Sequence, residues 1–456
     1  MQQLIAERAL LDDRIGERVR IRIDDQGDIA SVDTGSAAEG GELVQGLVLP
    51  GMPNLHGHAF QRAMAGLAER LMLGEASFWS WREVMYRFLE RLTPDDVQAI
   101  AAQLYVEMLE AGYTSIGEFH YLHHDPNGRP YAEPAAMSAA ILEAQRASGI
   151  GLTLLPVLYT SGGFGGAEPA PGQRRFVHDL DRFGRLLEWT AKATRNDPNL
   201  GFGLAPHSLR AIRDDQIDEV VRMLDQLDPD APIHIHVAEQ VREVRECLEW
   251  CGQRPVEHLL GLAEVGRRWC LIHATHMSEA ETAAVAASGA VAGLCPSTEA
   301  NLGDGLFGLA EFLAAGGRFG IGSDSHVSVS PVEELRWLEY GQRLQTLRRL
   351  IAGAERRPHT GARLLRAALE GGAQALGRAI GRIAPGCRAD LVVVDDRHPL
   401  LAAARDEGLL DPLVFSGNVP LVRRVMVGGR WRVEDGRHPD RDAIAQRYVE
   451  TVERLV

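Results

Sequence analysis

The sequence predicts an α/β protein whose main part is a (β/α)8 TIM-type barrel, joined to a small β-sandwich domain that both chain ends build. From about Val48 onward, short apolar runs alternate with longer amphipathic stretches, as in repeated β-α units around a parallel sheet. The flanking residues 3–45 and 383–434 instead contain short alternating segments, typical of strands. The expected organisation is a discontinuous β domain (1–47 and 383–436), the barrel (48–382) and a C-terminal helix (437–456).

Each expected barrel strand is a short apolar run followed by a segment with helical character. The helix predicted over 93–110, for example, has Thr93 as its N-cap and Pro94 at its first position. No Gly-x-Gly-x-x-Gly opens a helix after the first run, which argues against a dinucleotide-binding sheet. Eight such units favour a closed barrel over an open doubly wound sheet. The runs cover residues 46–58, 113–121, 151–159, 200–208, 232–239, 269–276, 290–297 and 318–325.

Composition and charge exclude several classes of protein. The 456 residues include 63 acidic and 48 basic side chains, which give a formal net charge of −15. Because no basic run collects positive charge, we expect neither a nucleic-acid partner nor an anionic membrane surface. No apolar run reaches the roughly 18 residues of a membrane span, and the N-terminus lacks an apolar leader, so a cytoplasmic protein is expected. The five cysteines show no Cys-x-x-Cys spacing, so neither a disulfide framework nor a structural zinc knuckle is indicated.

Metal-binding residue types follow several of the expected strands. In such a barrel, catalytic groups lie at the C-terminal ends of the strands. His56 and His58 are two positions apart on an extended strand, so both point to the same face and can bind one ion. His236 and Asp324, at the ends of the fifth and eighth strands, can complete the site. Imidazoles with one carboxylate suit Zn²⁺ or Fe²⁺ with a position left open for water.

These residues lie in segments that resemble the amidohydrolase superfamily. The segments are LPGMPNLHGH, HVAE, the end of the sixth strand with His273, and GSDS. The match extends over nearly the whole chain, including PGCRADLVVVD at 385–395. The resemblance implies the barrel fold, a metal-dependent hydrolase and, with the small β domain, a homodimer. The shared His-x-His and late Asp indicate the chemistry and leave the substrate open.

Lysine content separates the branches of this superfamily. Lys192 is the only lysine, and it lies in an expected helix. Binuclear members generally carry a carboxylated, metal-bridging lysine at the end of the fourth strand, where this chain has Ala-Pro-His at 205–207. The chain therefore resembles the mononuclear deaminase branch, which implies one zinc ion per chain, with iron as an alternative. In that branch the His-x-x-Glu after the fifth strand supplies a metal ligand, here His236, and a proton carrier, here Glu239.

The residue types of this branch suggest how hydrolysis would proceed. Asp324 can take the proton of the attacking water, and His273 can hydrogen-bond to that water and orient it. Glu239 can then protonate the departing nitrogen, so that ammonia leaves instead of an amide anion. The alternative for Glu239 is a carboxylate that only stabilises the N-terminus of a helix through its dipole.

Donor side chains near the expected barrel mouth indicate the kind of substrate. Two arginines and several further donors in an acidic protein suit carboxylates better than a neutral purine. Glu299 stands where ring deaminases of this branch more often have Asn, which also weakens the case for a nucleobase. The donors are Gln61, Arg82, Tyr121, His207 and Arg210.

The segments around these donors resemble one subgroup of the branch. They read HAFQRAM, FWSWRE, EFHYLHH, APHSLR and CPSTEANLGDG. Members of the subgroup hydrolyse N-formimino-L-glutamate to N-formyl-L-glutamate and ammonia in histidine degradation, with one zinc. The resemblance implies a small dicarboxylate as substrate, with one carboxylate held by Gln61, Arg82 and Tyr121. It implies that His207 and Arg210 hold the other.

Two other functions stay open at this point. A nucleobase or other ring-amidine deaminase would use the same metal site, and a non-catalytic binding protein can share the barrel frame. The glycine-rich segment 161–172 is expected to be a loop over the barrel mouth. His234 and Cys295 are expected to be buried structural residues. Most of His120, His123, His124, His276 and His326 are expected to lie behind the site or at the surface.

Overall fold

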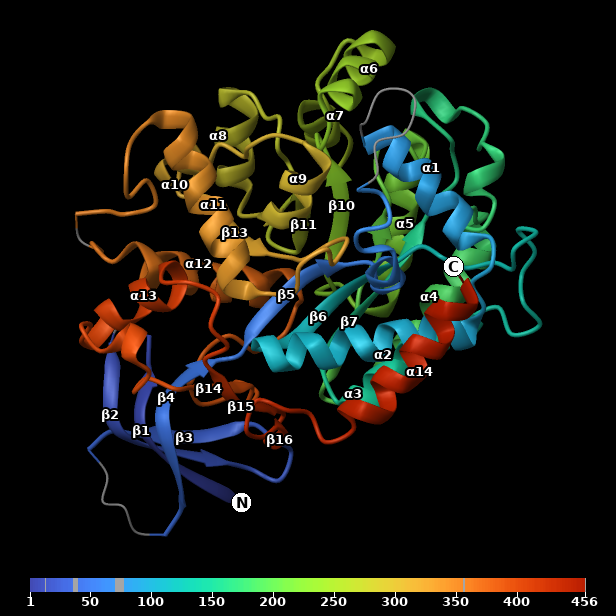
Figure 1. The fold of residues 1–456 in the computed structure, drawn as a ribbon. Coiled ribbons are helices and arrows are strands. Elements are labelled where there is room, and N and C mark those ends of the chain that lie inside the picture. Colours follow the sequence, from blue (N-terminus) through green and yellow to red (C-terminus); the bar gives the residue numbers. More distant parts are fainter. Residues whose placement is uncertain (13, 36–39, 70–77, 356, 456) are drawn as a thin grey trace.

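The computed structural model describes residues 1–12, 14–35, 40–69, 78–355 and 357–455. Strands from both chain ends form one seven-stranded sheet, in the order β16-β15-β14-β4-β1-β2-β3 (Figure 1). The C-terminal strands therefore lie directly beside the N-terminal ones, as the sequence predicts. The strands are β1 (Gln2–Leu10), β2 (Ile15–Ile23), β3 (Ile29–Asp33), β4 (Glu42–Pro50), β14 (Leu391–Val394), β15 (Val422–Val427) and β16 (Arg430–Val433).

β4 joins the two chain ends within this sheet. It pairs with β1 in parallel and with β14 in antiparallel register, where Val392 lies opposite Leu49. Because side chains alternate along a strand, one face of the sheet builds a small core of its own and the other packs against the barrel. The sheet curls until Asp28 forms a bridge with Arg388, so the small core is enclosed as in a sandwich.

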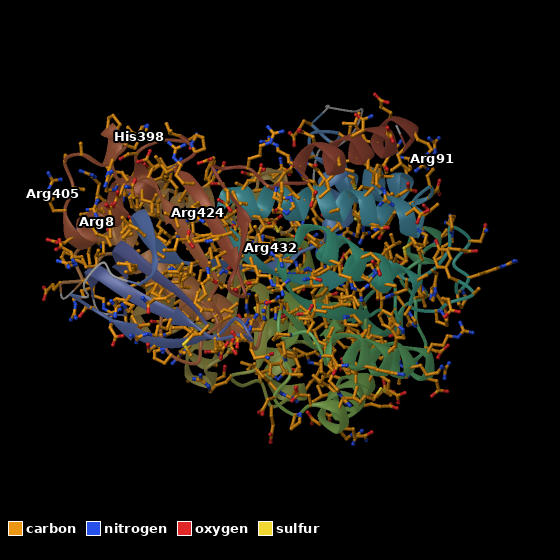
Figure 2. All side chains as sticks on the ribbon, turned by 90° about the horizontal axis from the view of Figure 1, so that it is seen from below. Arg8, Arg91, His398, Arg405, Arg424 and Arg432 are labelled. Atoms are coloured by element: carbon orange, nitrogen blue, oxygen red, sulfur yellow. The ribbon has the colours of Figure 1, made fainter. Side chains whose placement is uncertain are left out.

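Ion pairs also link the chain ends at the surface of this sheet. Arg8 of β1 pairs with the buried carboxylate of Asp396, which follows β14. Arg424 of β15 pairs with Glu42 of β4 at 2.6 Å, and its guanidinium lies 3.6 Å from the ring centroid of Trp431. Figure 2 shows Arg8 and Arg424 on the side of the molecule that carries the sheet. The pair of Arg424 and Glu42 joins positions 382 residues apart in the chain.

The remaining strands form the barrel. β5 to β8 make one parallel sheet and β10 to β13 another, and β9 pairs with β7. Isolated parallel bridges join the two sheets, between Leu204 and Ile233 on one side and between Gly57 and Asp324 on the other. The strands thus close into a ring in chain order, and the predicted fold class is confirmed. They are β5 (Met52–Gly57), β6 (Tyr113–His120), β7 (Gly151–Leu158), β8 (Leu200–Phe202), β9 (Ala205–Pro206), β10 (Ile233–Val237), β11 (Trp269–His273), β12 (Val291–Leu294) and β13 (Arg318–Ile321).

One predicted strand run is divided between the two parts of the fold. The run 46–58 contains the end of β4 and the whole of β5, which are separated at Gly51. A side chain at Gly51 would place its Cβ 2.1 Å from Oγ1 of Thr114, so glycine is needed at this crossing. The division of the chain into domains stays a prediction, and residues 48–50 still belong to the seven-stranded sheet.

Helices follow the barrel strands and cover the barrel (Figure 1). α2 begins with the predicted Thr93 N-cap, which forms a capping box with Asp96, and it ends at Gly112, whose φ is 100°. No helix within the described ranges is long and apolar enough to cross a membrane. The α-helices are α1 (Phe78–Leu89), α2 (Pro94–Ala111), α3 (Ala136–Ser148), α4 (Leu180–Thr194), α5 (Asp214–Leu227), α6 (Val241–Cys251), α7 (Pro255–Leu262), α8 (Glu279–Ser288), α9 (Pro296–Leu302), α10 (Leu309–Ala314), α11 (Pro331–Thr346), α12 (Thr360–Ala375), α13 (Leu410–Phe415) and α14 (Arg441–Leu455). Short 3-10 helices are η1 (Ala59–Met64), η2 (Phe164–Gly166), η3 (Pro171–Gln173), η4 (Pro399–Leu401) and η5 (Asp406–Leu409).

The C-terminal helix α14 packs along α2, on the outside of the barrel (Figure 1). Arg454 near the end of α14 pairs with the buried carboxylate of Asp96. Arg441 at its start lies 3.6 Å from the carboxylate of Glu110 at the other end of α2. The last helix of the chain therefore covers α2, the helix that precedes β6.

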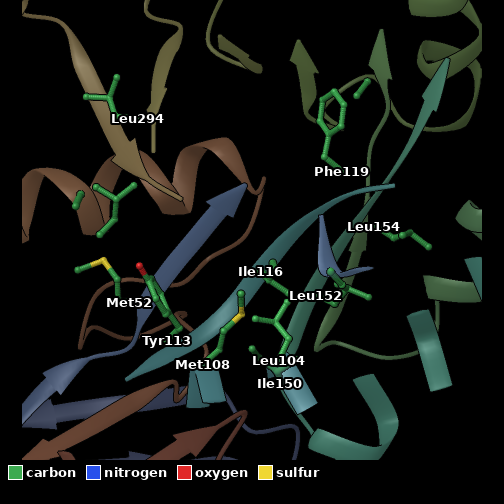
Figure 3. Packing of buried hydrophobic residues seen from close by; sticks show 14 of the residues in the cluster. Met52, Leu104, Met108, Tyr113, Ile116, Phe119, Ile150, Leu152, Leu154 and Leu294 are labelled. Carbon is green, nitrogen blue, oxygen red and sulfur yellow. The ribbon is translucent and has the colours of Figure 1, made fainter. Parts of the chain in front are cut away.

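The barrel strands and α2 share one hydrophobic core. Figure 3 shows Leu104 and Met108 of α2 near Ile116 of β6, and all three side chains are buried. Phe119, at the end of β6, extends this core toward the barrel mouth, where its ring centroid lies 4.4 Å from that of His236. The apolar core thus reaches the side chains of the candidate metal site.

Gly371→Ala is expected to destabilise the protein. Gly371 lies inside α12, and a Cβ there would approach the carbonyl oxygen of Phe319 in β13 to 1.9 Å. Because backbone atoms would have to move, we expect the loss of about 1–3 kcal/mol that is typical of overpacking. Gly261→Ala is the matched control, since that helical glycine has open space and alanine there should gain about 0.5–1 kcal/mol. Urea unfolding measures both variants, and an undiminished stability of Gly371→Ala would contradict the close packing of α12 on β13.

Candidate active site

Four side chains converge at the C-terminal ends of the barrel strands. His56 belongs to β5, His58 follows it directly, His236 belongs to β10, and Asp324 follows β13. One ligand atom of each lies within 4.8 Å of the others. Nε2 of His56 is 3.1 Å from Nε2 of His236. Oδ1 of Asp324 is 3.5 Å from Nε2 of His56 and 3.2 Å from Nε2 of His58.

Backbone carbonyls orient two of these imidazoles toward the shared point. Nδ1 of His58 lies 2.8 Å from the carbonyl oxygen of Phe119, and Nδ1 of His236 lies 3.1 Å from that of His207. A hydrogen on each Nδ1 satisfies these carbonyls and leaves the Nε2 lone pairs able to bind a cation. Burial lowers the pKa of His56 to about 3 and that of His236 well below its ordinary value, which favours the neutral, ligating imidazole. The donor set therefore fits Zn²⁺ or Fe²⁺.

Gly57 is needed between the two histidines at the end of β5. A Cβ at this position would lie 2.4 Å from Cε1 of His326. The ring of His326 is held there, since its Nε2 accepts a hydrogen bond from the backbone N–H of His58 at 3.1 Å. Its Nδ1 lies 2.8 Å from Oγ of Ser323. His326 thus stands behind the site, as expected, and supports the turn that presents His58.

The backbone is strained at two candidate functional residues near the C-terminal ends of barrel strands. His273 and Asp324 have φ values of 67° and 47°, in the left-handed region that residues other than glycine rarely adopt. Such a conformation costs on the order of 1–3 kcal/mol per residue and persists only where the surrounding structure holds it. Strain of this kind is concentrated at active sites, and both side chains here line the same pocket.

Carboxylates surround His273. Its Nε2 lies 3.7 Å from Oε1 of Glu239 and 3.8 Å from Oδ2 of Asp324. Its Nδ1 lies 3.2 Å from Oε1 of Glu299. Burial disfavours the imidazolium, but the nearby carboxylates outweigh burial and raise the pKa of His273 to about 10. Burial raises the pKa of Glu239 and so favours its protonated form.

All five predicted substrate residues line one pocket, together with the candidate proton carrier Glu239. Nε2 of Gln61 donates to the hydroxyl of Tyr121 at 2.8 Å. Nη2 of Arg210 lies 3.8 Å from Oε2 of Glu239, which brings a cation beside that carboxyl group. The pocket thus combines hydrogen-bond donors with the groups that could move protons. The five residues are Gln61, Arg82, Tyr121, His207 and Arg210.

Some residues at the site are not among the predicted ones. Tyr159 and Phe176 line the pocket beside the donors, although their positions in the sequence are ordinary. Glu118 is buried beneath η1, where it accepts hydrogen bonds from the N–H of Ala59 at 2.9 Å and from the hydroxyl of Tyr105 at 3.0 Å. A carboxylate inside an apolar strand run is the one sequence signal that could have identified Glu118.

Other residues singled out in the sequence have structural places. Nε2 of His234 lies 2.7 Å from the carbonyl oxygen of Ala375, so the predicted core histidine is confirmed. Burial raises the pKa of the Cys295 thiol, which suits packing and disfavours nucleophilic attack. In the glycine-rich segment 161–172, the ring of Phe164 stacks on that of Trp250 with centroids 5.6 Å apart. The place of this segment over the barrel mouth stays a prediction.

Known proteins similar to this chain carry related activities. A model of the amidohydrolase family matches residues 47–432. A formimidoylglutamate deiminase of Pseudomonas aeruginosa is 52% identical over 456 residues, which cover 100% of both chains. A 5-methylthioadenosine/S-adenosylhomocysteine deaminase of Natronomonas pharaonis is 30% identical over 93% of this chain and 88% of its own length.

Solved structures share the fold. The crystal structure of an amidohydrolase from Brucella melitensis has a TM-score of 0.94 and 48% identity, and the match covers 100% of both chains. An adenosine deaminase from Xanthomonas campestris with bound zinc has a TM-score of 0.82 over 100% of this chain and 98% of that chain. At 22% identity, this second likeness shows the fold alone. The resemblance seen in the sequence is confirmed by the family model and the full-length relative, and the chain belongs to the amidohydrolase family.

Proposed function

We propose that this protein is a zinc-dependent hydrolase that converts N-formimino-L-glutamate to N-formyl-L-glutamate and ammonia, a step of histidine degradation. The reaction breaks a C–N bond in a linear amidine. The observation that carries the proposal is that hydrogen-bond donors suited to carboxylates line one pocket together with three of the four candidate metal ligands, His58, His236 and Asp324. Similarity to a formimidoylglutamate deiminase over the full length, at 52% identity, supports the same substrate. The enzyme would act on this small dicarboxylate in the cytoplasm as a homodimer, without a nucleic-acid or membrane partner.

A dicarboxylate fits the donors of the pocket. Arginine presents a planar fork of N–H groups that matches a carboxylate. The pocket contains two such side chains, Arg82 and Arg210. We assign one carboxylate of the substrate to Gln61, Arg82 and Tyr121. The other is assigned to His207 and Arg210.

The formimino group fits the acidic side of the pocket. It is an amidine that is cationic near neutral pH, so nearby carboxylates attract it. Glu239 and Asp324 both line the pocket, and each has an oxygen within 4.0 Å of Nε2 of His273, at 3.7 Å and 3.8 Å. The reacting carbon would therefore lie near His273, with the carboxylates of the substrate toward the arginines.

The metal site is assigned to His56, His58, His236 and Asp324, with one zinc ion per chain and iron as the alternative. A zinc ion held there would supply a nucleophile near neutral pH by lowering the pKa of water to about 7. Oδ1 of Asp324 faces the candidate metal ligand His58, whereas its Oδ2 faces His273. Oδ2 is therefore the oxygen that takes the proton of the attacking water. His273 donates a hydrogen bond to the water oxygen and orients it toward the formimino carbon.

Glu239 is assigned the proton transfer to the leaving nitrogen. Attack of water on the formimino carbon gives a tetrahedral adduct with two nitrogens, and the one that is protonated leaves. Burial raises the pKa of Glu239 and so favours the protonated form that can act as an acid. Its proton goes to the terminal nitrogen, the C–N bond breaks and ammonia departs. The hydroxyl proton of the adduct then passes to the carboxylate of Glu239 as the formyl C=O bond forms. Protonation of the other nitrogen would instead release formamide and glutamate.

Arg82→Met is expected to lower kcat/KM for N-formimino-L-glutamate. The substitution removes a charged donor and keeps a side chain of similar length, so one carboxylate loses its charged partner. Removal of one partner of a buried charge pair costs about 2–5 kcal/mol, roughly 30- to 5,000-fold. Arg87→Met, on the exposed face of the same helix, is the matched control. Equal kcat/KM values for the two variants in steady-state kinetics would contradict the assignment of Arg82 to substrate binding.

A ring-amidine deaminase is the alternative function, and the 30% identical 5-methylthioadenosine/S-adenosylhomocysteine deaminase favours it. Ammonia release from N-formimino-L-glutamate, guanine, cytosine and S-adenosylhomocysteine, measured under identical conditions, separates the two functions. We expect turnover of N-formimino-L-glutamate alone. Deamination of a ring substrate without turnover of N-formimino-L-glutamate would reverse the assignment. Absence of bound metal after purification in added zinc would favour a non-catalytic barrel protein.

A further inference from the structure

Asp304 is a buried carboxyl group that the mechanism above does not use. It follows α9 and is 4% exposed. Its N–H donates to the carbonyl oxygen of Glu299 at 2.9 Å, and its own carbonyl oxygen lies 2.7 Å from Nε2 of His276. Its Oδ1 accepts a hydrogen bond from the side-chain amide of Gln240. Its Oδ2 has no hydrogen-bond partner among the residues that the structure describes.

This carboxyl group lies beside the candidate proton carrier. One ligand atom each of Glu239, His273 and Asp304 lies within 4.8 Å of the others. Gln240, which donates to Asp304, comes directly after Glu239 in the chain, so the two carboxyl groups are fixed relative to each other. Two buried carboxylates this close repel each other, and such a pair retains a proton more readily than either group would alone.

We propose that Asp304 is a positioning residue: its carboxyl group beside Glu239 makes the pair hold one proton, and this proton stays available for the leaving nitrogen. The inference rests on the proposed function, because it concerns the proton that Glu239 delivers. In that step the O–H bond of Glu239 breaks as an N–H bond forms on the leaving nitrogen, and the C–N bond then breaks to release ammonia. As ammonia leaves, the hydroxyl proton of the adduct passes to the carboxylate of Glu239 and the formyl C=O bond forms. Glu239 is thus protonated again, and the proton that Asp324 took from the attacking water balances the positive charge that the amidine brought in.

The charges around Glu239 explain why it needs this neighbour. Burial raises the pKa of Glu239, whereas two cations act against burial. These are His273, with Nε2 at 3.7 Å, and Arg210, with Nη2 at 3.8 Å. Burial, with the charge of Glu239, also raises the pKa of Asp304 to about 9. The other titratable groups that face the pair are Glu243 of α6, Glu299 of α9, Asp324 after β13 and His276, which holds the backbone of Asp304.

The pH dependence of kcat in Asp304→Asn tests the proposal. Asparagine keeps an acceptor oxygen for Gln240 and removes the second carboxyl group of the pair. Glu239 then ionises without repulsion from a neighbouring carboxylate, and so loses its proton at lower pH. Because the reaction needs protonated Glu239, the basic limb of the kcat profile should move to lower pH by about 1–3 units. Glu311→Gln is the matched control. It removes an exposed carboxylate from α10, seven residues farther along the chain, and should leave the limb in place.

Gln240→Met is a second variant with the opposite expected sign. It removes the donor to Oδ1 of Asp304, so the ionised pair loses a hydrogen bond and should hold its proton to higher pH. The basic limb of kcat should then move upward. The proposal would be overturned if the basic limb of the kcat profile stayed in place in both variants. It would also be overturned if the limb moved upward in Asp304→Asn and downward in Gln240→Met.

Infrared difference spectroscopy tests the pair without turnover. Zinc-loaded wild-type protein at neutral pH should show the C=O band of a protonated carboxyl group that the Asp304→Asn variant lacks. If this band is present and N-formimino-L-glutamate is not hydrolysed, the shared proton is supported and the substrate assignment fails. If the wild-type protein is active and the two spectra agree in this region, the shared proton is refuted and the proposed function stands.

Discussion

His236→Ala is expected to remove both the bound metal and the turnover. His236 supplies one of the ligand atoms that lie within 4.8 Å of one another, and its Nδ1 is held 3.1 Å from the carbonyl oxygen of His207. Alanine removes this ligand and opens the site, so zinc affinity should fall steeply. Because a metal ion contributes several kcal/mol of transition-state stabilisation, kcat should fall by about a thousandfold or more. Metal analysis by mass spectrometry and an ammonia assay measure the two effects.

The control for this variant is His398→Ala, the same substitution at a histidine that lies in the part of the molecule with the small sheet (Figure 2). It should keep one zinc per chain and unchanged turnover.

Chelation of the wild-type protein should abolish activity, and added zinc should restore it. A His236→Ala protein that retains stoichiometric zinc and activity would contradict the assigned ligand set.

Glu239→Gln is expected to lower kcat by about 10²- to 10⁴-fold, the usual contribution of general acid–base catalysis. The amide keeps the size of the side chain and cannot protonate the leaving nitrogen. Glu239 is not one of the four assigned metal ligands, so the zinc content should not change. Single-turnover measurements should show that bond cleavage itself is slowed.

Glu249→Gln, on the exposed side of the following helix α6, is the matched control for Glu239→Gln. It removes the same charge outside the pocket and should leave kcat unchanged. A Glu239→Gln enzyme with kcat close to that of the wild type would reduce Glu239 to a carboxylate that stabilises the start of α6.

The candidate metal ligands could be predicted because the C-terminal ends of parallel barrel strands meet at one edge. The spacing of His56 and His58 puts both on one face of a strand, and His236 and Asp324 lie near the ends of runs with strand character. These local patterns and one topological rule suffice to bring the four side chains together. The donors of the pocket follow strand ends for the same reason, except Arg82, which belongs to α1.

Contacts between distant segments could not be predicted in this way. The carbonyl of Phe119 that orients His58 and the ring of His326 behind Gly57 depend on how the strand ends pack in three dimensions. Glu299 is unusual in the sequence, but its place 3.2 Å from Nδ1 of His273 follows only from the fold. Asp304 lies in the segment CPSTEANLGDG, but nothing in that segment distinguishes it from the rest of the 63 acidic residues as a neighbour of Glu239.

Product identification after incubation of the zinc-loaded protein with N-formimino-L-glutamate tests the central claim most directly. Water attack with proton transfer from Glu239 to the terminal nitrogen predicts ammonia and N-formyl-L-glutamate in equal amounts. Formamide and glutamate would show that the other nitrogen is protonated and would contradict the role of Glu239. No turnover of this substrate by zinc-loaded protein, with deamination of a ring substrate in its place, would contradict the assignment of the pocket to a dicarboxylate.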